Sequence, residues 1–590
     1  MPLDTGITGD EAETRAAVAA WLKRFEAAVA AGTADALADM FVPEAHWRDL
    51  VALTWTIRTT SGAQAIGATL AESVAAHTPS GFTLAPGRVG PRRVQRAGVD
   101  CIEALFAFKT AHGNGSGVVR LRTDADGSIE RRAWIVATTL DDLAKHGITE
   151  GQSIAADAFS RDFGGENWKD KRDRRDAFAE NEPAVVVVGA GQAGLGIAAR
   201  LTALGVDTLL IDAHARIGDN WRKRYHSLTL HNEVHVNHLP FLPFPKTFPV
   251  FIPKDKLANW FESYADIMDI ATWTSTQLVS GSYDDDAGRW TLKLDQGERG
   301  TRVVRPRHVV FATGVSSIPV TPDLPGLSDF AGTVMHSAAY IDGADWAGRR
   351  ALVIGTGNSA HDVAQDLHAS GAHVTMVQRA SSYIVSLAQA QKVYALYDEG
   401  PSVDDCDLIT TASPYDLLID AYKRSTAAMK VADRALLDGL SAAGFALDDG
   451  APDGTGFQMK YLRRGGGYYF NVGCSDLIAS GDIKLVRAAD IERYAADGAV
   501  LRDGGTVAAD LIVTATGYKN QQETVRHYLG DAIADRIGPV WGYGEGAEKG
   551  DGELRNMWRP TAQRGLWFTA GSLAQCRIYS KFLALQIAAR

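Results

Sequence analysis

The chain has 590 residues, of which 46% are apolar and 22% are charged, and its formal net charge is −11. This length is too great for one hydrophobic core, so it predicts several domains of a globular protein. The acidic balance and the lack of a long basic run argue against nucleic acid as a partner.

The four cysteines are scattered along the chain, and none belongs to a C-x-x-C pair or a zinc-binding spacing. So few cysteines fit a reducing compartment, and the stretch from Met1 to Arg15 is too acidic and polar for a signal peptide. The longest apolar run, Ala184 to Ala199, is interrupted by glycines and predicts strand, turn and helix instead of a membrane span. We therefore expect a cytoplasmic protein without a membrane span.

Residues 1–150 predict a separate α+β domain. Helical periodicity runs from Glu11 to Ala31, and a second helical stretch covers Ala34 to Met40. Short strands separated by turn signals follow; they are expected at 45–53, 93–99, 102–109, 117–123 and 129–138. Helices before a strand meander indicate a curved sheet. Residues 151–182 are rich in charge and are interpreted as a partly helical linker, or alternatively as a solvated helix face.

A glycine-rich loop follows the apolar strand that ends at Val188. Its cofactor-binding candidates are Gly189, Gly191, Gln192 and Gly194. Glycines there permit a tight turn and close approach of backbone N–H groups to a pyrophosphate, and the following helix adds its dipole. Asp212 ends the next strand, close to the interval of about 20 residues at which a carboxylate binds ribose hydroxyls. The loop therefore predicts a site for FAD or NAD.

A second loop of the same kind follows the strand that ends at Ile354. Its candidates are Gly355, Gly357, Asn358, Ser359 and Ala360. Here the next strand ends in Gln378 and Arg379, so the ribose-binding carboxylate is missing and a cation is adjacent. That arrangement suits the 2′-phosphate of NADPH, although Arg379 as an ordinary surface cation stays open.

Two further strands end in a small-small-glycine segment, at Gly314 and at Gly517. Such an ending lets the chain pass close to a bound cofactor. Together with the loops, these segments predict two doubly wound, Rossmann-like α/β domains.

The segment from Phe330 to Tyr340 matches the pattern F-x-G-x-x-x-H-x-x-x-Y and lies between the two glycine loops. With Trp221 and the run from Lys460 to Tyr469, it resembles the flavin-containing monooxygenases, including their plant YUCCA-like branch. The resemblance covers about 183–590. It implies an FAD-binding domain in 183–345 and 510–590, and an NAD(P)-binding domain with a helical insertion in 346–509.

The resemblance implies a reaction and its cofactors. FAD is reduced by NADPH, with NADH possible, and the reduced flavin forms a peroxide or hydroperoxide with O2 that passes one oxygen atom to a small sulfide, amine or ketone. Trp221 and Gly571 would help to bind the cofactor, and His231 with Asn232 would lie near the flavin. A neutral His231 would serve as a hydrogen-bond donor whose titration makes activity pH-sensitive. A packed loop histidine stays open.

The N-terminal region resembles the cone-like nuclear transport factor and SnoaL-like fold. Flavin-containing monooxygenases with such an extension are grouped as type II, which use both NADH and NADPH and carry out Baeyer–Villiger oxidation. His46 and Asp49 are candidates for lining a pocket, with a purely structural module as the alternative. A homodimer is expected. Two other functions stay open: an NAD(P)H oxidase that releases hydrogen peroxide, and a non-catalytic assembly protein built on the cone.

Overall fold

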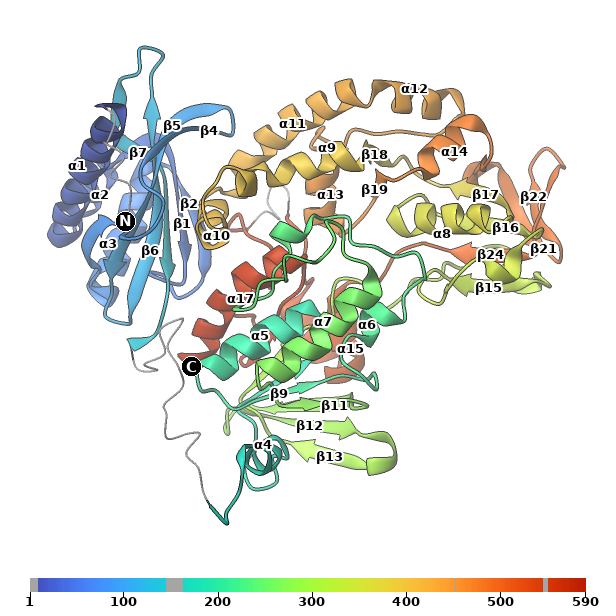
Figure 1. Cartoon of the computed structure of the whole chain (residues 1–590), viewed down its shortest axis with the longest axis horizontal. Helices are drawn as coiled ribbons and strands as arrows, with labels where there is room; N and C mark the ends of the chain where they lie inside the picture. The colour runs from blue at the N-terminus through green and yellow to red at the C-terminus, as the bar shows by residue number, and fades with distance from the viewer. Residues whose placement is uncertain (1–8, 145–162, 451, 545–549) are drawn as a thin grey trace.

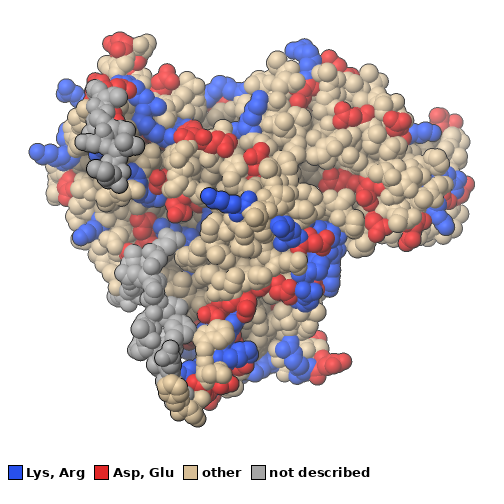
Figure 2. Space-filling view, in the orientation of Figure 1, with Lys and Arg blue, Asp and Glu red and all other residues tan. Residues whose placement is uncertain are grey.

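The structure is a computed structural model of the whole chain, and it describes residues 9–144, 163–450, 452–544 and 550–590. The N-terminal domain lies at one end of the molecule, next to the C-terminal helix and to helices of the insertion (Figure 1). On the face viewed in Figure 2, acidic and basic side chains are interspersed. No helix among the described residues is long and apolar enough to cross a membrane.

The N-terminal domain is a mixed seven-stranded sheet with helices on one face (Figure 1). Its strand order is β2-β1-β7-β6-β5-β3, with β4 also paired to β5, and only the β1–β7 pair is parallel. The helices are α1 (Gly9–Ala31), α2 (Ala34–Ala38) and α3 (Ala63–His77). The strands are β1 (Phe41–Leu50), β2 (Ile57–Ser61), β3 (Ser80–Leu84), β4 (Arg92–Arg96), β5 (Val99–Lys109), β6 (Asn114–Thr123) and β7 (Ile129–Leu140).

The two predicted helices correspond to α1 and α2, and the predicted strands to β1 and β4 to β7. The order of helices followed only by strands is wrong, because α3 lies between β2 and β3, and none of these three elements was predicted. The apolar side of α1, with Val18, Trp21, Leu22 and Phe25, is buried against the sheet, as its helical period requires. In the linker 151–182, residues 151–162 lie outside the described part of the chain. The remainder contains α4 (Trp168–Asp176), which begins with a capping box at Asn167.

The first Rossmann-like sheet is parallel throughout, with the order β10-β9-β8-β14-β25. Its strands are β8 (Val185–Val188), β9 (Thr208–Ile211), β10 (Thr272–Trp273), β14 (His308–Phe311) and β25 (Leu566–Phe568). The packed helices are α5 (Gln192–Ala203), α7 (Lys254–Ile267) and α17 (Leu573–Ala588). The chain therefore returns to this sheet at its C-terminal end, since β25 pairs with β14 and α17 packs on α5.

The second Rossmann-like sheet is also parallel, with the order β15-β24-β16-β17-β20. Its strands are β15 (Thr333–His336), β16 (Arg350–Ile354), β17 (His373–Gln378), β20 (Lys484–Arg487) and β24 (Leu511–Thr514), with α8 (Asn358–Ala369) after β16. Strands β15 and β24 thus belong to the second sheet, although the limits 346–509 leave both outside the NAD(P)-binding domain. The sequence could not show this, because strand pairing is a long-range property.

Smaller elements connect or follow the strands of these two sheets. They are α6 (Asp219–Arg222), η3 (Val234–Val236), β11 (Gln277–Asp284), β12 (Arg289–Asp295), β13 (Thr301–Val304), α14 (Cys474–Ser480), β21 (Ile491–Ala495), β22 (Gly498–Leu501), β23 (Thr506–Ala508), α15 (Gln521–Leu529) and α16 (Asp531–Ile537).

A helical insertion separates β17 from β20 and extends from the second sheet to the N-terminal domain (Figure 1). It consists of β18 (Tyr383–Ser386), α9 (Leu387–Gln391), η7 (Lys392–Asp398), α10 (Val403–Thr411), α11 (Tyr415–Ala432), α12 (Arg434–Ala442), α13 (Gly456–Arg464) and β19 (Tyr468–Asn471). Helix α10 lies beside the sheet of the N-terminal domain.

Candidate functional site

The two glycine loops have the same geometry. Gly189 and Gly355 both have a positive φ, +102° and +129°, a region that favours glycine. A Cβ atom on Gly189 would lie 2.9 Å from the carbonyl oxygen of Ala312, and one on Gly355 would lie 2.5 Å from that of Ala515. The two small-small-glycine segments therefore run directly against the first glycine of each loop.

The first loop opens helix α5. Gly191 is its N-cap, and a Cβ on Gly194 would overlap the carbonyl oxygen of Gly189, so the third glycine lets the helix start against the loop. A Cβ on Gly191 would lie 2.9 Å from Asn220 Nδ2, and Asn220 Oδ1 is buried without a hydrogen-bond partner in the described structure. The N-terminus of α5 and the unsatisfied Asn220 Oδ1 thus lie on either side of Gly191, and both are groups that a ligand can satisfy.

Asp212 ends β9 beside this loop. Its Oδ2 accepts the Ala190 N–H at 2.7 Å, and its Oδ1 accepts the His214 N–H at 2.8 Å and faces His214 Nδ1 at 2.9 Å. Burial raises the pKa of the Asp212 carboxyl, but the hydrogen bonds from His214 and Ala190 outweigh it and leave the pKa below its ordinary value. The predicted ribose-binding residue is therefore an ionised carboxylate held firmly at the loop.

Three further predicted cofactor residues are linked by hydrogen bonds. Trp221 Nε1 donates to Gln192 Oε1 at 3.3 Å, and Gln192 Nε2 donates to the Gly571 carbonyl oxygen at 3.3 Å. Gly571 precedes α17, which begins with a capping box between Ser572 and Gln575. The first turns of helices α5 and α17 are therefore neighbours.

Gly314 lies beyond Ala312 with φ +76°, and its carbonyl oxygen accepts Gln521 Nε2 at 2.6 Å. In the second sheet, Gly517 has φ +88° and its carbonyl oxygen accepts the Val320 N–H at 2.9 Å. Both glycines thus have a positive φ, in the region that favours glycine.

The second loop opens helix α8, with Gly357 as its N-cap and Ser359 half-buried in the first turn. Ala360 is fully buried, which explains why a small residue stands at the third position. Asn358 does not point freely to a ligand: its Oδ1 accepts the Phe470 N–H from β19 at 3.1 Å. The side chain of Asn358 thus ties the helical insertion to the loop.

Gln378 and Arg379 have different surroundings. Gln378 is fully buried, and its amide exchanges two hydrogen bonds with the Ala446 backbone, at 2.8 and 2.9 Å. Arg487, which ends the neighbouring strand β20 opposite Gln378, donates to Gln378 Oε1, whereas Arg379 is exposed. The carboxyl ends of β17 and β20 therefore place two arginines, Arg379 and Arg487, close to Gln378. The sequence did not indicate Arg487, because it lies on a strand far along the chain.

His231 and Asn232 lie together on the loop before η3, next to the insertion. The His231 ring meets the Phe470 ring edge to face at 4.9 Å, and its carbonyl oxygen accepts Gln391 Nε2 at 2.6 Å. His231 is exposed to solvent, yet the protein around its ring disfavours the charged form and lowers its pKa to about 4. The ring is therefore neutral at physiological pH and titrates below the ordinary range of histidine.

Asn232 is held by a residue that the sequence did not indicate. Its side chain shares a hydrogen bond with the Tyr394 hydroxyl of η7, and its carbonyl oxygen accepts Asn237 Nδ2 at 2.9 Å. Neither Gln391 nor Tyr394 belongs to a recognisable motif. Only the folded insertion brings them to this loop.

The fingerprint residues between the loops are structural. Tyr340 donates from its hydroxyl to Asp366 Oδ2 of α8 at 2.6 Å and is fully buried. A Cβ on Gly332 would lie 2.6 Å from the Phe330 ring. His336 packs edge to face on Tyr518 with ring centroids 5.3 Å apart.

His46 and Asp49 do not form one site. They lie three residues apart on β1, so their side chains project from opposite faces of the sheet. Asp49 is fully buried and accepts hydrogen bonds from Leu53, Thr54 and Thr138. Its carboxylate therefore caps the turn after β1 and is not turned toward a pocket.

The four cysteines are buried and free, and the described residues contain no group of three or more side chains that could hold a metal ion.

Comparison with known proteins gives consistent matches. Residues 186–394 match the family described as pyridine nucleotide-disulphide oxidoreductase. The chain is 31% identical over 365 residues to the indole-3-pyruvate monooxygenase YUCCA1 of Oryza sativa subsp. japonica, covering 62% of this chain and 82% of that protein. It is 32% identical over 340 residues to the probable indole-3-pyruvate monooxygenase YUCCA4 of Arabidopsis thaliana, covering 57% and 76%.

Two solved structures are similar at lower identity. A flavin-containing monooxygenase from Stenotrophomonas maltophilia is 19% identical with a TM-score of 0.46, covering 69% of this chain and 98% of that chain. An open structure of cyclohexanone monooxygenase is 21% identical with a TM-score of 0.46, covering 58% and 75%.

Proposed function

The chain belongs to the flavin-containing monooxygenase family, and from that premise we propose that it inserts one oxygen atom of O2 into a small organic sulfide, amine or ketone. FAD and NADPH are its cofactors. The observation that carries the proposal is the pair of equivalent glycine loops, each closed by a small-small-glycine segment from a neighbouring strand. One loop would serve each cofactor.

The residues of the first loop fit FAD. A side chain on Gly191 would crowd Asn220, and the unpaired Asn220 Oδ1 is an acceptor suited to a hydroxyl of the ligand. The ionised Asp212 suits the ribose, and the N-termini of α5 and α17 suit the pyrophosphate. Bound FAD supplies the redox chemistry, taking a hydride from NADPH and activating O2.

The second loop fits NADPH better than NADH. Gln378 occupies the position where a carboxylate would bind a free ribose, and its amide is fully engaged by Ala446 and Arg487. Arg379 and Arg487 would bind the 2′-phosphate with charge-assisted hydrogen bonds. We propose this pair as the source of NADPH preference.

His231 and Asn232 would act as hydrogen-bonding groups beside the flavin. The low pKa of His231 keeps the imidazole neutral, so it can donate one proton in a hydrogen bond without adding charge. A Baeyer–Villiger oxidation of a ketone belongs to the same proposal.

The N-terminal domain is proposed to be cone-like, with its sheet curved around α1 to α3. We also propose that the NAD(P)-binding domain be extended to include β15 and β24, because both strands pair within its sheet.

The test is a product assay with ¹⁸O2. Purified protein is supplied with NADPH and a thioether, a tertiary amine or a cyclic ketone, and NADPH use, hydrogen peroxide and labelled product are measured together. We expect a yellow protein and one labelled oxygen atom in the product for each NADPH consumed. Release of all the reducing equivalents as hydrogen peroxide with every substrate would instead favour an NAD(P)H oxidase.

A further inference from the structure

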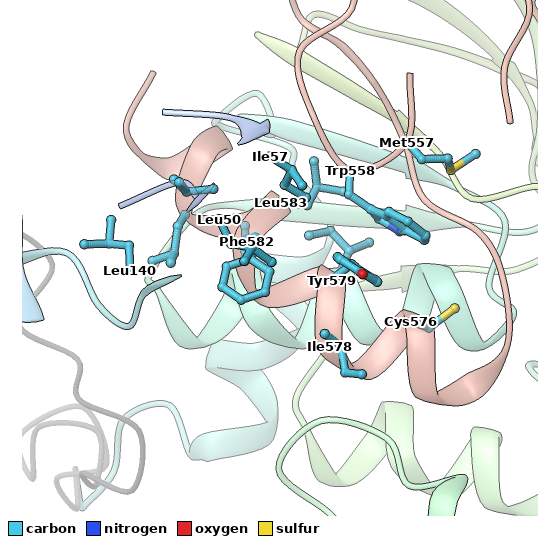
Figure 3. Close-up of a cluster of buried hydrophobic side chains, with 14 of the residues drawn as sticks. Leu50, Ile57, Leu140, Met557, Trp558, Cys576, Ile578, Tyr579, Phe582 and Leu583 are labelled. Atoms are coloured by element: carbon cyan, nitrogen blue, oxygen red, sulfur yellow. The ribbon is translucent and has the colours of Figure 1, made fainter. Parts of the chain in front are cut away.

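The N-terminal domain is packed tightly onto the flavoprotein part of the chain. Figure 3 shows Leu50, Ile57 and Leu140 of its sheet in one buried cluster with side chains of α17 and the segment before it. The other labelled members are Met557, Trp558, Cys576, Ile578, Tyr579, Phe582 and Leu583. The sheet thus has helices on one face and the rest of the molecule on the other.

Buried arginines join this sheet to the end of helix α10. Arg48 is 3% exposed and donates to Glu553 at 2.8 and 2.7 Å and to the Thr411 carbonyl oxygen at 2.9 Å. Arg120 is paired with the equally buried Glu103 and donates to Ser413 Oγ at 2.8 Å. Both side chains therefore fix the chain that leaves α10.

A second contact reaches the end of η7. Glu399 is its C-cap residue and accepts two hydrogen bonds from Arg96, both at 2.7 Å, while Arg92 lies 3.0 Å away. Arg88 pairs with Asp405 of α10 at 2.6 Å. The segment 399–411 is thus held by the N-terminal domain at several points.

The end of α9 and the following η7 hold the loop that carries His231 and Asn232. Gln391, the last residue of α9, donates to the His231 carbonyl oxygen, and the Tyr394 hydroxyl of η7 interacts with the Asn232 side chain. Asp407 of α10 accepts the Tyr397 hydroxyl at 2.7 Å.

Asp407 also pairs in bidentate fashion with Arg577 of α17, at 2.7 Å in both contacts. Arg577 in turn donates to the Val236 and His238 carbonyl oxygens, each at 2.9 Å. Contacts between described residues therefore lead without a break from the N-terminal arginines to the loop 231–238.

We propose that the N-terminal domain is a positioning element of the flavin site, and that Arg96 and Arg120 are positioning residues for the loop 231–238. They act through η7 and α10 and touch neither cofactor nor substrate. The catalytic part of this inference rests on the proposed function, since it requires that His231 and Asn232 face the flavin. The mechanical part rests only on the contacts above.

The mechanical part is tested by hydrogen exchange in the full-length holoenzyme. Glu399→Gln weakens the Arg96 contact without burying a charge, because Glu399 is 31% exposed. We expect exchange in peptides covering 388–399 and 230–238 to become about threefold to tenfold faster, as for loss of one partly exposed charge pair. The matched control is Glu262→Gln in α7 of the first Rossmann-like domain. It weakens another bidentate arginine–glutamate pair, between Arg216 and Glu262, which lies away from the N-terminal domain.

Ser413→Ala provides an independent variant, since it deletes only the hydroxyl that Arg120 reaches. Faster exchange at 230–238 in both variants, with unchanged FAD content and no change in the control, supports the inference. Unchanged exchange at 230–238 in both variants overturns it.

The catalytic part is tested by the hydrogen peroxide released per NADPH, which we expect to rise about threefold to tenfold in the same two variants. Faster exchange without any oxygenated product from wild-type protein would count against the proposed function alone. Faster exchange with unaltered peroxide release from an active enzyme would overturn the positioning role.

Discussion

Replacing Arg48 with methionine should loosen the N-terminal domain more than any other single change at this interface. Arg48 and Glu553 are 3% and 5% exposed, and the pair is bidentate. After the change, Glu553 keeps one hydrogen bond, from Thr59 Oγ1 at 2.8 Å. An uncompensated charge at such a site costs about 3–5 kcal/mol, so we expect the free energy of opening of this domain to fall by that amount.

The assay follows hydrogen exchange in peptides of β1 and β7, because a chain of several domains need not unfold in one step. Arg48→Met combined with Glu553→Leu removes both charges and should recover about 2 kcal/mol or more of the loss. A single variant that loses less than about 1 kcal/mol would refute the reasoning, since the pair would then be as weak as an exposed one. So would a double variant that is no more stable than the single one.

Other changes should separate the roles of individual residues. Gly191→Val should abolish the bound yellow flavin, since its side chain would crowd Asn220 and fill the space in which a pyrophosphate would approach the loop backbone, and a protein that keeps FAD would contradict the assignment. Arg379→Ala should raise the KM for NADPH about 10- to 150-fold and leave that for NADH nearly unchanged; equal changes would remove its role. Because the folded-state pKa of His231 is about 4, below the unfolded value of about 6.5, the unfolded state takes up the proton first and wild-type stability falls as pH drops from about 6.5 to 4; His231→Gln does not titrate, so the wild type should lose stability relative to this variant over that range, and parallel curves would contradict the shift. Tyr340→Phe should lower stability by about 1 kcal/mol through loss of the hydrogen bond to Asp366 while FAD content stays constant; loss of flavin would indicate a direct role in binding.

The features that the sequence predicted well are local. The loop at Gly189 and the loop at Gly355 each combine a buried strand, a turn with positive φ and a helix within a short stretch of chain. Asp212 follows from the length of one strand–helix–strand unit, which the glycine spacing already defines. These signals need no knowledge of distant residues, so the residues alone were enough.

What the sequence left out depends on contacts between distant segments. Arg487 becomes relevant only because β20 pairs with β17 and brings its last residue opposite Gln378. Tyr394 reaches Asn232 only through the folding of a helical insertion without a motif. The low pKa of His231 likewise comes from the enclosure of its ring, which no local pattern encodes.

The chemistry of the domain interface indicates more than adhesion. Burying an ion pair costs desolvation free energy that the charges only partly return, so an apolar interface would hold two domains together as well or better. The cluster around Tyr579 and Phe582 already provides such burial. The directed hydrogen bonds of Arg48 and Arg120 add orientation, because a guanidinium group fixes its carboxylate and carbonyl partners in one geometry. A domain that was merely appended would not require that geometry, whereas one that sets the position of α10 would.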